Sequence, residues 1–462
     1  VYASHDGRRY RHRPGGRTLR TDGRVYVGLA LFGGGADSPM SATFDRIRLS
    51  YPRLEYRTSW VGNTLPGPVE DTVSLNMTGL FTASDGTCYT TSFFEEQGHC
   101  LAAYKDGKNV GPGRKTATAG IAITSNGTYV FASHKNGFHR LDMDLASGRT
   151  FVKVSDEEKG YETVRGLAAD AKEVFVGNRP ADRIEVFDCE SLKRKRHMKF
   201  ERPGPMSLDA DGRLWVIREG FETSTYEFLD GPYPHEAEIV CVDRQSGRVQ
   251  KTVTGPAVPT GIAFDPRGRL LVADNGTDQQ MKIYDVTGQP RLVGTVGTRG
   301  GMYAGTPGAV TDGKLNGLTG VGADANGNVY VTSTGWPFTY ISPGTMANAT
   351  TLRAFGPEAV GRANPETLWT LESLAYIFDG ATLDPKDERR LYAGGDQVFR
   401  MDWSKGPGQE GTYVAFTSNL RDFPHEALGR RARCTPWVRW LEGVKFLVLR
   451  DKPGLCFYRF GP

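Results

Sequence analysis

The sequence lacks the features that mark several large classes of protein. No apolar run is long enough to cross a bilayer, and stretches with the 3.6-residue period of an amphipathic helix are scarce. No signal-peptide pattern opens the chain, which starts within a strand-like pattern, as a processed or truncated protein would. The net charge is only +4 over 462 residues, without the basic asymmetry of a nucleic-acid groove. We therefore expect no nucleic-acid partner and no membrane span.

Motifs of several enzyme classes are also missing. The chain has no GxSxG elbow, no P-loop, no HExxH and no EF-hand loop. Its 6 cysteines include no CxxC pair, which argues against a zinc ribbon. Cys88 and Cys100 flank an expected hairpin, so we predict a disulfide between them and leave the pairing of the other cysteines open. The even count suits an oxidising compartment, with unpaired buried thiols as the alternative.

What the sequence has is glycine and strand-like runs. The chain contains 58 glycines, and runs of Val, Ile, Tyr, Phe and Thr are broken by Gly, Asp and Asn throughout, which indicates an all-β protein. One pattern recurs: a small residue, an apolar strand, a polar turn such as Asp-Gly, and a second strand rich in Val, Tyr and Trp. A third strand, and often a more polar fourth, follows. The pattern starts near Thr78 and at Ala119, Arg165, Gly204, Thr260 and Thr319.

This repeat predicts a β-propeller of four-stranded blades, because its period of roughly 40 to 60 residues is that of a propeller blade. A sheet with two apolar faces buries both by packing between neighbours, and a closed ring leaves no end blade to cap. Residues 380–403 with 411–417, and residues 437–460, fit the pattern less well. With residues 54–60 supplying the last strand, we expect residues 52–462 to form an eight-bladed ring closed by strands from both of its ends, with seven blades as the alternative.

Residues 1–51 do not follow the blade pattern. They carry Asp22 and Gly23, then YVGLA at 26–30, then ATFD at 42–45. This order resembles the last strands of a concanavalin-like (laminin-G-like) jelly roll. The resemblance implies a partial β-sandwich-like segment, an extracellular and glycan-associated architecture, and assembly through this segment. We therefore expect an extracellular or cell-surface protein, with the periplasm as the alternative.

Residues 259–276, PTGIAFDPRGRLLVADNG, resemble the NHL-repeat and gluconolactonase propellers. The shared residues are Pro259, Gly261, Ile262, Ala263, Asp265, Gly268, Leu270, Val272, Ala273 and Asp274. The resemblance covers residues 77–356 and implies the propeller fold. Lactonases of this kind hold a divalent metal at the pore, so the resemblance also implies a divalent cation such as calcium near Asp274. Thr260 departs from the pattern, because Asn often follows the proline in that family.

One face of a propeller carries the loops between second and third strands and the connections between blades, and ligands usually bind there. We call it the pore face. Our candidates for ligand contact on it are Glu96, His99, His134, Asn136, Arg165, Asn178, Arg179, Arg218, Glu219, Asp274, Asn275, Asn316, Trp336 and Arg450. The arginines of blades three and four suit uronic or sulfated groups, and Trp336 suits a stacked sugar ring. The insertion at residues 220–238 predicts a lid or a partner surface.

These features favour a secreted or surface propeller that binds a glycan or a protein ligand without chemistry. The alternative is a carbohydrate-active enzyme, a lyase or hydrolase, with His134 as the base and Arg165 or Arg179 neutralising a uronate. A metal-dependent lactonase is a third hypothesis. The same residues also have structural interpretations: Asp274 can hold a turn, and charged pairs at loop ends are often solvated.

Overall fold

The structure is a computed structural model. It describes residues 2–3, 11–12, 53–56, 77–92, 100–111, 120–156, 163–220, 237–301, 304, 311–315, 317–333, 350–373, 381–393, 397–400, 412–418, 437–451 and 454–460. The chain forms two compact units, Thr58–Tyr376 with Pro407–Glu410, and Val1–Arg57 with Ile377–Gly406 and Gly411–Pro462. Among the described residues, no helix has both the length and the apolar character needed to span a membrane.

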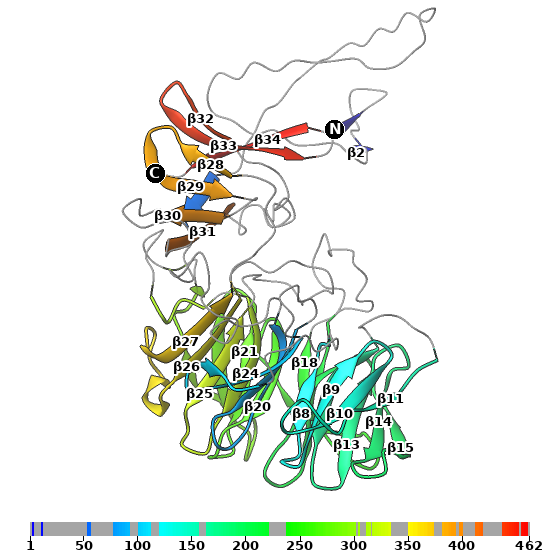
Figure 1. Cartoon of the computed structure of the whole chain (residues 1–462). Helices are drawn as coiled ribbons and strands as arrows, with labels where there is room; N and C mark the ends of the chain where they lie inside the picture. The colour runs from blue at the N-terminus through cyan, green and yellow to red at the C-terminus, as the bar shows by residue number, and fades with distance from the viewer. Residues whose placement is uncertain are drawn as a thin grey trace, which may run out of the picture. The chain divides into compact units, whose positions relative to one another are not determined.

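The larger unit contains six four-stranded antiparallel sheets in the described residues, each built from strands that follow one another in the chain (Figure 1). We number them blade one to blade six. Their strands are β4 (Met77–Thr82), β5 (Cys88–Ser92), β6 (Leu101–Lys105) and β7 (Lys108–Asn109); β8 (Ile123–Ser125), β9 (Tyr129–His134), β10 (Gly137–Asp142) and β11 (Thr150–Lys153); β12 (Val164–Ala169), β13 (Glu173–Asn178), β14 (Arg183–Asp188) and β15 (Arg194–Lys199); β16 (Pro203–Leu208), β17 (Leu214–Arg218), β18 (Glu238–Val242) and β19 (Val249–Val253); β20 (Pro259–Phe264), β21 (Leu270–Asp274), β22 (Gln280–Asp285) and β23 (Arg291–Val296); β24 (Leu318–Ala323), β25 (Val329–Ser333), β26 (Thr350–Phe355) and β27 (Thr367–Ser373). A short 3-10 helix, η4 (Pro357–Ala359), follows β26. The predicted all-β propeller of four-stranded blades is confirmed.

The ring closes where blade six packs against blade one. In Figure 1 the blue strands of blade one lie beside the yellow-green strands of blade six, and one apolar cluster draws residues from both. A Cβ atom on Gly322 would lie 2.1 Å from Thr82 Oγ1, so the two innermost strands are in close contact. Ala325 N also donates a hydrogen bond to Ser84 O across this seam, at 2.9 Å. This is a normal length for an N–H···O hydrogen bond. The predicted eight blades, and the alternative of seven, are therefore wrong: the ring has six.

The segments expected to be blades seven and eight form strands in the other unit. These are β28 (Ala381–Asp384), β29 (Asp387–Ala393), β30 (Gln397–Arg400), β31 (Thr412–Ser418), β32 (Trp437–Leu441), β33 (Val444–Asp451) and β34 (Gly454–Phe460). The strand β3 (Arg53–Tyr56) joins β34 as predicted, in parallel, but its other edge pairs with β31. One eight-stranded sheet results, with the order β28-β29-β30-β31-β3-β34-β33-β32. Because β3 satisfies two open strand edges at once, it merges the two segments and does not close the ring.

The two ends of this eight-stranded sheet are joined by polar contacts. Trp440 Nε1 on β32 donates to Asp384 Oδ1 on β28 at 3.2 Å. Lys445 forms an ion pair with the same carboxylate and donates to the Tyr392 hydroxyl at 2.5 Å. Burial raises the pKa of Asp384, but the hydrogen bonds from Lys445, the Lys386 backbone and Trp440 outweigh it and lower the pKa overall.

Aspartates hold the turns between first and second strands, which explains the repeated Asp after the first apolar run. Asp265 Oδ1 accepts from the backbone N–H groups of Arg267 (3.0 Å) and Arg269 (2.8 Å), and Oδ2 accepts from Arg269 Nε (2.7 Å). In blade six, Asp324 binds its turn in the same way and also accepts from the Tyr330 hydroxyl at 3.0 Å. The carboxylate satisfies turn N–H groups that have no strand partner.

The structure contradicts the predicted Cys88–Cys100 disulfide. Cys88 lies opposite Tyr104, whereas Cys100 lies beside Ser92 at the other end of β5. Four residues of extended strand span about 13 Å, beyond the roughly 7 Å that a disulfide bridges between Cα atoms. Of the cysteines whose side chains are described, Cys88, Cys189 and Cys241 are buried free thiols, and Cys100 is also buried.

Of the N-terminal segment 1–51, the structure describes β1 (Tyr2–Ala3) and β2 (Arg11–His12), which pair with each other. The residues that resemble a concanavalin-like jelly roll, from Asp22 to Asp45, lie outside the described residues.

Candidate functional site: the pore face of blades three and four

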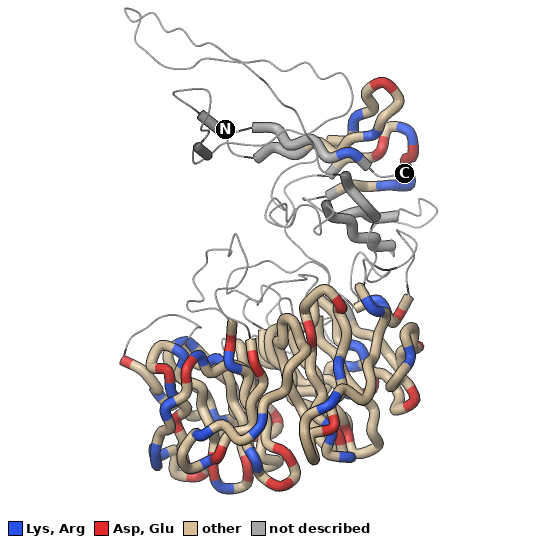
Figure 2. The backbone as a smooth tube through the Cα atoms, turned by 180° about the vertical axis from the view of Figure 1, so that it is seen from behind, with Lys and Arg blue, Asp and Glu red and all other residues tan. Residues whose placement is uncertain are grey.

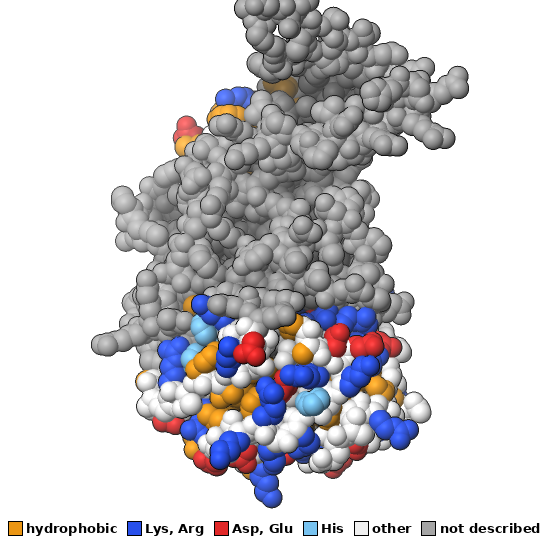
Figure 3. All heavy atoms as spheres, turned by 90° about the vertical axis from the view of Figure 1, so that its right-hand side faces the viewer, with side chains coloured by type: hydrophobic (Ala, Val, Ile, Leu, Met, Phe, Trp, Pro, Cys, Tyr) orange, Lys and Arg blue, Asp and Glu red, His pale blue; other side chains and the backbone are white. Residues whose placement is uncertain are grey.

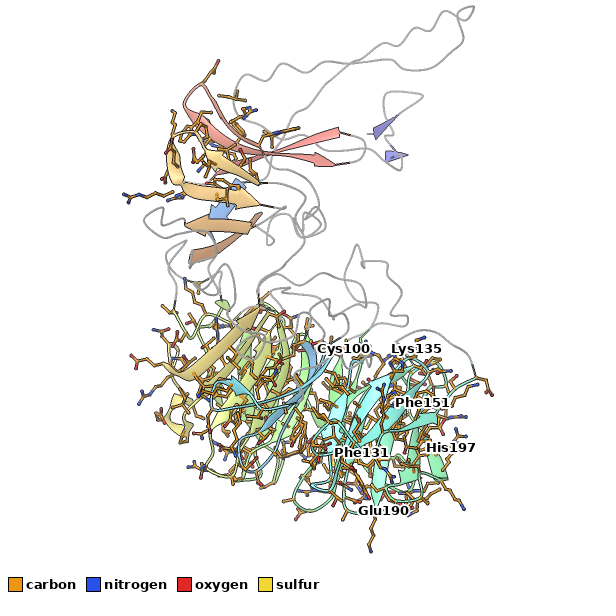
Figure 4. All side chains as sticks on the ribbon, in the orientation of Figure 1. Cys100, Phe131, Lys135, Phe151, Glu190 and His197 are labelled. Carbon is orange, nitrogen blue, oxygen red and sulfur yellow. The ribbon has the colours of Figure 1, made fainter. Side chains whose placement is uncertain are left out.

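Turns between second and third strands lie on one edge of the ring, opposite those between third and fourth strands. In Figure 4, Cys100 and Lys135 lie along the upper edge of blades one and two, and Glu190 lies at the lower edge of blade three. The upper edge is therefore the pore face. The candidates Asn178 and Asp274 are the last residues of the second strands β13 and β21, so both lie at this face.

The innermost strands of five blades begin with a β-bulge at the pore face. The register shifts lie between Met77 and Gly79, Val164 and Gly166, Pro203 and Met206, Pro259 and Gly261, and Leu318 and Gly320. A bulge leaves an extra residue unpaired and re-aims its side chain. In blades one, five and six that residue is a threonine, whereas in blade three it is Arg165.

Two of the bulge threonines, Thr78 and Thr260, join neighbouring blades. Thr78 Oγ1 in blade one donates to Gly120 O, just before blade two, at 2.8 Å. Thr260 Oγ1 in blade five donates to Leu318 O, at the start of blade six, at 2.7 Å. Thr260, at the position where lactonases often carry Asn, is therefore an inter-blade contact.

In blade three the same bulge position reaches the next blade through an ion pair. Arg165 Nη2 lies 2.7 Å and Nε 3.1 Å from Glu219 Oε1, at the end of β17 in blade four. Arg179, which follows β13, contacts the same carboxylate through Nε and Oε2 at 3.3 Å. The exposed fractions are 4% for Arg165, 7% for Arg179 and 0% for Glu219. The structure thus brings together three of the predicted candidates in a buried group.

Three residues that the sequence analysis did not select complete this group. Arg202 Nε donates to the backbone oxygen of Glu219 at 2.8 Å, and Arg202 N donates to Asp182 Oδ1 at 2.8 Å. Asp182 also lies 3.6 Å from Arg179 Nη1. Gly204 is required here, because a Cβ atom on it would lie 2.6 Å from Glu219 Cγ. We call Arg165, Arg179, Arg202, Asp182 and Glu219 the arginine cluster.

The arginine cluster carries an excess of positive charge. Within the described residues it holds three guanidinium groups and two carboxylates, a balance of +1. The guanidinium groups of Arg165 and Arg179 contact carboxylates, whereas that of Arg202 contacts the backbone oxygen of Glu219. Burial lowers the pKa of Arg179, and the nearby Arg165 cation lowers it further, against the raising effect of Glu219. Two buried guanidinium groups thus share one buried carboxylate.

Two buried polar atoms lie on the strand ends that carry these arginines. Asn178 is 1% exposed; its Nδ2 donates to Glu185 Oε1 at 3.0 Å, while its Oδ1 has no hydrogen-bond partner among the described residues. Thr163 is 0% exposed and its Oγ1 likewise has none within that part of the chain. The backbone links them, since Arg179 N donates to Thr163 O at 2.9 Å.

Two other candidates have hydrogen-bond or ion-pair partners outside the arginine cluster. Arg218 Nη1 pairs with Glu238 at 2.6 Å, and its guanidinium lies over the Phe200 ring. Asn136 Nδ2 donates to Ser155 O at 3.0 Å, which ties a turn to the next connection.

His134 packs in an aromatic group at blade two, away from the contacts of the arginine cluster. Its ring centroid lies 5.2 Å from that of His139 and 6.2 Å from that of Phe151, which is labelled in Figure 4. Burial, the Arg149 cation and His134 lower the pKa of His139 to about 4. Within the described residues, His134 and the arginines of the cluster thus contact different side chains.

Asp274 and Asn275 hold the blade-five turn. Asp274 Oδ1 accepts from the backbone N–H groups of Ala257 (3.1 Å), Val258 (2.9 Å) and Gly276 (3.1 Å), and Oδ2 lies 2.7 Å from Lys282 Nζ. A carboxylate with four such donors does not suit a cation, so the residues present do not fit the divalent metal that the lactonase resemblance implies. The described residues contain no cluster of three or more His, Cys, Asp or Glu able to hold a metal ion. In the same turn, Asn275 accepts from the Gln279 side chain at 2.9 Å.

Several candidates lie outside what the structure describes. These are Glu96, His99, Asn316 and Trp336, together with residues 221–236 of the blade-four insertion. Arg450 lies on β33 in the eight-stranded sheet of the other unit, so its assignment to a blade of the ring is wrong.

The surface of the propeller mixes charges of both signs. Figure 2 shows Lys and Arg interspersed with Asp and Glu along its turns, and Figure 3 shows the same mixture over the outer strands of the face it presents. In the basic run of β15, Arg196 binds Glu173 through two hydrogen bonds of 2.6 and 2.9 Å, and Lys195 lies 2.8 Å from the same carboxylate. Internal ion pairs thus neutralise part of this strand.

The chain has distant similarity to known proteins. No protein-family model matches the chain. The chain is 22% identical over 175 residues to the antigen Lp49 of Leptospira interrogans, which covers 36% of this chain and 38% of that protein. The chain therefore matches well under half the length of that relative.

Among solved structures, a streptogramin B lyase is 12% identical, with a TM-score of 0.39 over 75% of this chain and 96% of that one. A catalytically inactive virginiamycin B lyase from Staphylococcus aureus, solved with quinupristin, is 11% identical, with a TM-score of 0.40 over 77% and 98%. The hydrazine synthase of Kuenenia stuttgartiensis is 13% identical, with a TM-score of 0.39 over 72% and 93%. Similarity at this level assigns this chain neither ligand nor reaction.

Proposed function

We propose that this propeller is a ligand-binding module whose pore face takes a glycan or a protein ligand, with an acidic group of the ligand held at the arginine cluster. The observation that carries the proposal is the buried, positively charged group formed by Arg165, Arg179 and Glu219. Guanidinium groups match carboxylates and sulfates through paired hydrogen bonds. An extracellular or cell-surface setting is part of the proposal.

Stability alone is a poor explanation for the arginine cluster. Elsewhere in the ring, Thr78 and Thr260 make the inter-blade contact from the same bulge position with one neutral hydrogen bond. Buried ion pairs often contribute no more than a well-packed apolar pair, because both charges lose their hydration. A chain that already uses threonine for this contact therefore gains little from Arg165, unless the charge serves another purpose.

Binding without chemistry is the better-supported form of the proposal. A uronate lyase needs a base within reach of the carbon next to the neutralised carboxylate. The ring of His134 packs with His139 and Phe151, whereas the arginines converge on Glu219. The lyase, hydrolase and lactonase hypotheses therefore have no geometric support in the described residues.

The test is a glycan array probed with the wild type and with Arg165→Thr and Arg179→Gln. Each variant leaves Glu219 paired with the other arginine, and Arg165→Thr copies the threonine of the other blades, so the fold should survive. We expect acidic glycans to bind the wild type and both variants to lose at least about tenfold in affinity.

The matched control is Arg291→Ala on β23, whose side chain is 72% exposed. It should bind as the wild type does. Unchanged binding by both cluster variants, or equal loss in the control, would contradict the proposal. A parallel assay for unsaturated uronate products tests the lyase alternative, and product formation that depends on His134 would favour chemistry.

A further inference from the structure

Arg202 differs from the other two arginines of the arginine cluster in its exposure. Arg165 and Arg179 are 4% and 7% exposed, and both contact the Glu219 carboxylate. Arg202 is only partly buried, and its side chain makes one contact among the described residues, from Nε to the backbone oxygen of Glu219. Its terminal nitrogens, Nη1 and Nη2, have no partner in that part of the chain, and neither is a buried polar atom there. Both are therefore accessible to a ligand.

The position of Arg202 is fixed from both sides of the connection between blades three and four. Arg202 N donates to Asp182 Oδ1 at 2.8 Å, in the turn between β13 and β14. Glu219 N donates to Arg202 O at 3.0 Å, and Glu219 O accepts from Arg202 Nε at 2.8 Å. These three hydrogen bonds hold the backbone and the first nitrogen of the guanidinium group, so its far edge is held as well.

The backbone at Arg202 has a conformation that favours glycine. Its φ angle is +49°, in the left-handed region that residues with a Cβ atom adopt at a cost. The two backbone hydrogen bonds, to Asp182 and from Glu219, need no arginine side chain. Glycine would serve the backbone at least as well, so the presence of arginine is explained by what its side chain contacts.

A guanidinium group held through Nε presents its other edge. Nη1 and Nη2 each carry an outward N–H group, and the two groups lie parallel, which matches two oxygens of a carboxylate or a sulfate. Because the protein already holds Arg202, less conformational entropy is lost when the ligand binds. Arg165 and Arg179 are buried and hold the residue on which Arg202 rests, Glu219.

We propose that Arg202 contacts the acidic group of the ligand through Nη1 and Nη2, and that Arg165 and Arg179 are positioning residues that act through Glu219. The ligand group is an oxyanion with two oxygens for this edge, a carboxylate or a sulfate. This inference rests on the proposed function and names the residue that gives the site its specificity.

The experiment compares Arg202→Gly, Arg202→Lys and Lys135→Gly with the wild type. Lys135 is the matched control, because it is an exposed cation with a φ angle of +45° in blade two, on the same pore face (Figure 4). The probes are a galacturonic acid trimer, its methyl ester, and a sulfated galactose trimer. Calorimetry with the full chain gives the affinities, and thermal unfolding gives the stability of each variant.

We expect Arg202→Gly to unfold close to the wild-type temperature, since glycine suits the left-handed conformation and both backbone hydrogen bonds remain. It should bind the acidic probe at least about tenfold more weakly. Arg202→Lys should recover little of that loss, because an ammonium group does not present two parallel donors. Lys135→Gly should bind as the wild type does, and the methyl ester should bind poorly. A merely structural role for Arg202 would move stability and leave these affinities alone.

A double-mutant cycle tests the positioning role. Arg165→Thr should weaken binding in the wild-type background. In the Arg202→Gly background it should change the affinity by less than about twofold, because the residue that Arg165 positions is already absent. Additive losses would mean that Arg165 contacts the ligand itself, and they would overturn the positioning role.

The outcomes separate the two proposals. If Arg165→Thr and Arg179→Gln weaken binding but Arg202→Gly does not, the inference is overturned and the proposed function stands. An equal loss in Lys135→Gly, tight binding of the methyl ester, or a wild type that binds neither acidic probe also overturns the inference. If none of the arginine variants changes binding, both proposals are overturned. Binding of only one acidic probe identifies the ligand group as a carboxylate or as a sulfate.

Discussion

In several blades, a single aspartate accepts the hydrogen bonds of the turn between the first and second strands. Asp265 occupies the turn of blade five with a side chain that is 3% exposed, and it accepts three hydrogen bonds from Arg267 and Arg269. Its counterparts Asp209 and Asp324 accept from a buried Trp or Tyr as well. The motif that resembles NHL repeats therefore has a structural explanation at this residue.

We predict that Asp265→Ala lowers the free energy of unfolding by about 1.5 to 3 kcal/mol, because backbone and guanidinium donors lose a charged acceptor. The matched control is Asp211→Ala, in the equivalent turn of blade four, where the carboxylate is 72% exposed. It should change stability by less than about 0.5 kcal/mol. Urea denaturation of the two variants measures the difference, and equal losses would contradict this role for Asp265.

Residue types in the sequence indicated the candidate site residues, but only the contacts in the structure showed which of them lie together. Arg165, Arg179 and Glu219 were all predicted from their places at strand ends, and the structure unites them. Asp274 and Arg218 had the same standing in the sequence, yet each is bound within its own blade. The partner of a long charged side chain lies many residues away, so local sequence does not reveal it. An arginine at a bulge position where other blades carry threonine was the available signal.

The outer strand of each blade is anchored to the strands inside it, and in blade three charge does this. Glu173 on β13 binds Arg196 and Lys195 on β15. The hydrogen bonds from Arg196, and then from Lys195, outweigh burial and lower the pKa of Glu173 to about 2. A lowered pKa means that the folded state prefers the ionised carboxylate.

This shift predicts a specific dependence of stability on pH. The contribution of Glu173 is complete above the ordinary pKa of 4.5, and it is lost as the pH falls through 4.5 towards 2. Glu173→Gln should therefore unfold at lower urea concentration than the wild type at pH 7, with a difference that shrinks across this range. Glu201→Gln, at an exposed glutamate, is the control and should match the wild type throughout. A constant difference between Glu173→Gln and the wild type at all pH values would contradict the assignment.

Strand positions were predictable at the element scale. Each of the six repeat segments contains the first two strands of a blade, and the expected third strands coincide with β14, β18 and β22. The strands of residues 380–460 were also located correctly. Alternating burial and turn residues act over a few positions, so they define a strand without reference to its neighbours.

The closure of the ring depends on small residues at one seam. Gly322 on β24 faces Thr82 on β4, and a methyl group on Gly322 would lie 2.1 Å from Thr82 Oγ1 and 2.7 Å from its Cβ. This contact joins the first blade directly to the sixth in the part of the chain that the structure describes.

We predict that Gly322→Ala destabilises the propeller by about 1 to 3 kcal/mol through overpacking. Adding Thr82→Ala should recover part of that loss, since it removes the atoms in conflict. Gly288→Ala is the control, because a Cβ atom there meets nothing within 4 Å. Thermal unfolding of the four proteins tests the seam. If Thr82→Ala gave no recovery, or Gly288→Ala were equally damaging, blades one and six would not be joined in this way.

The sequence by itself determined the local structure of this protein. It located the strands, it marked the aspartates that bind the turns, and its sheets with two apolar faces indicated that they stack as blades. Only the tertiary structure decided that the ring closes at six, that β3 merges the last strands into a separate sheet, and that Arg165 meets Glu219 in the next blade. The physical reason is the distance along the chain over which each kind of interaction acts. Strand and turn preferences act between residues close in the chain, whereas blade number and ion-pair partners depend on which distant surfaces fit together.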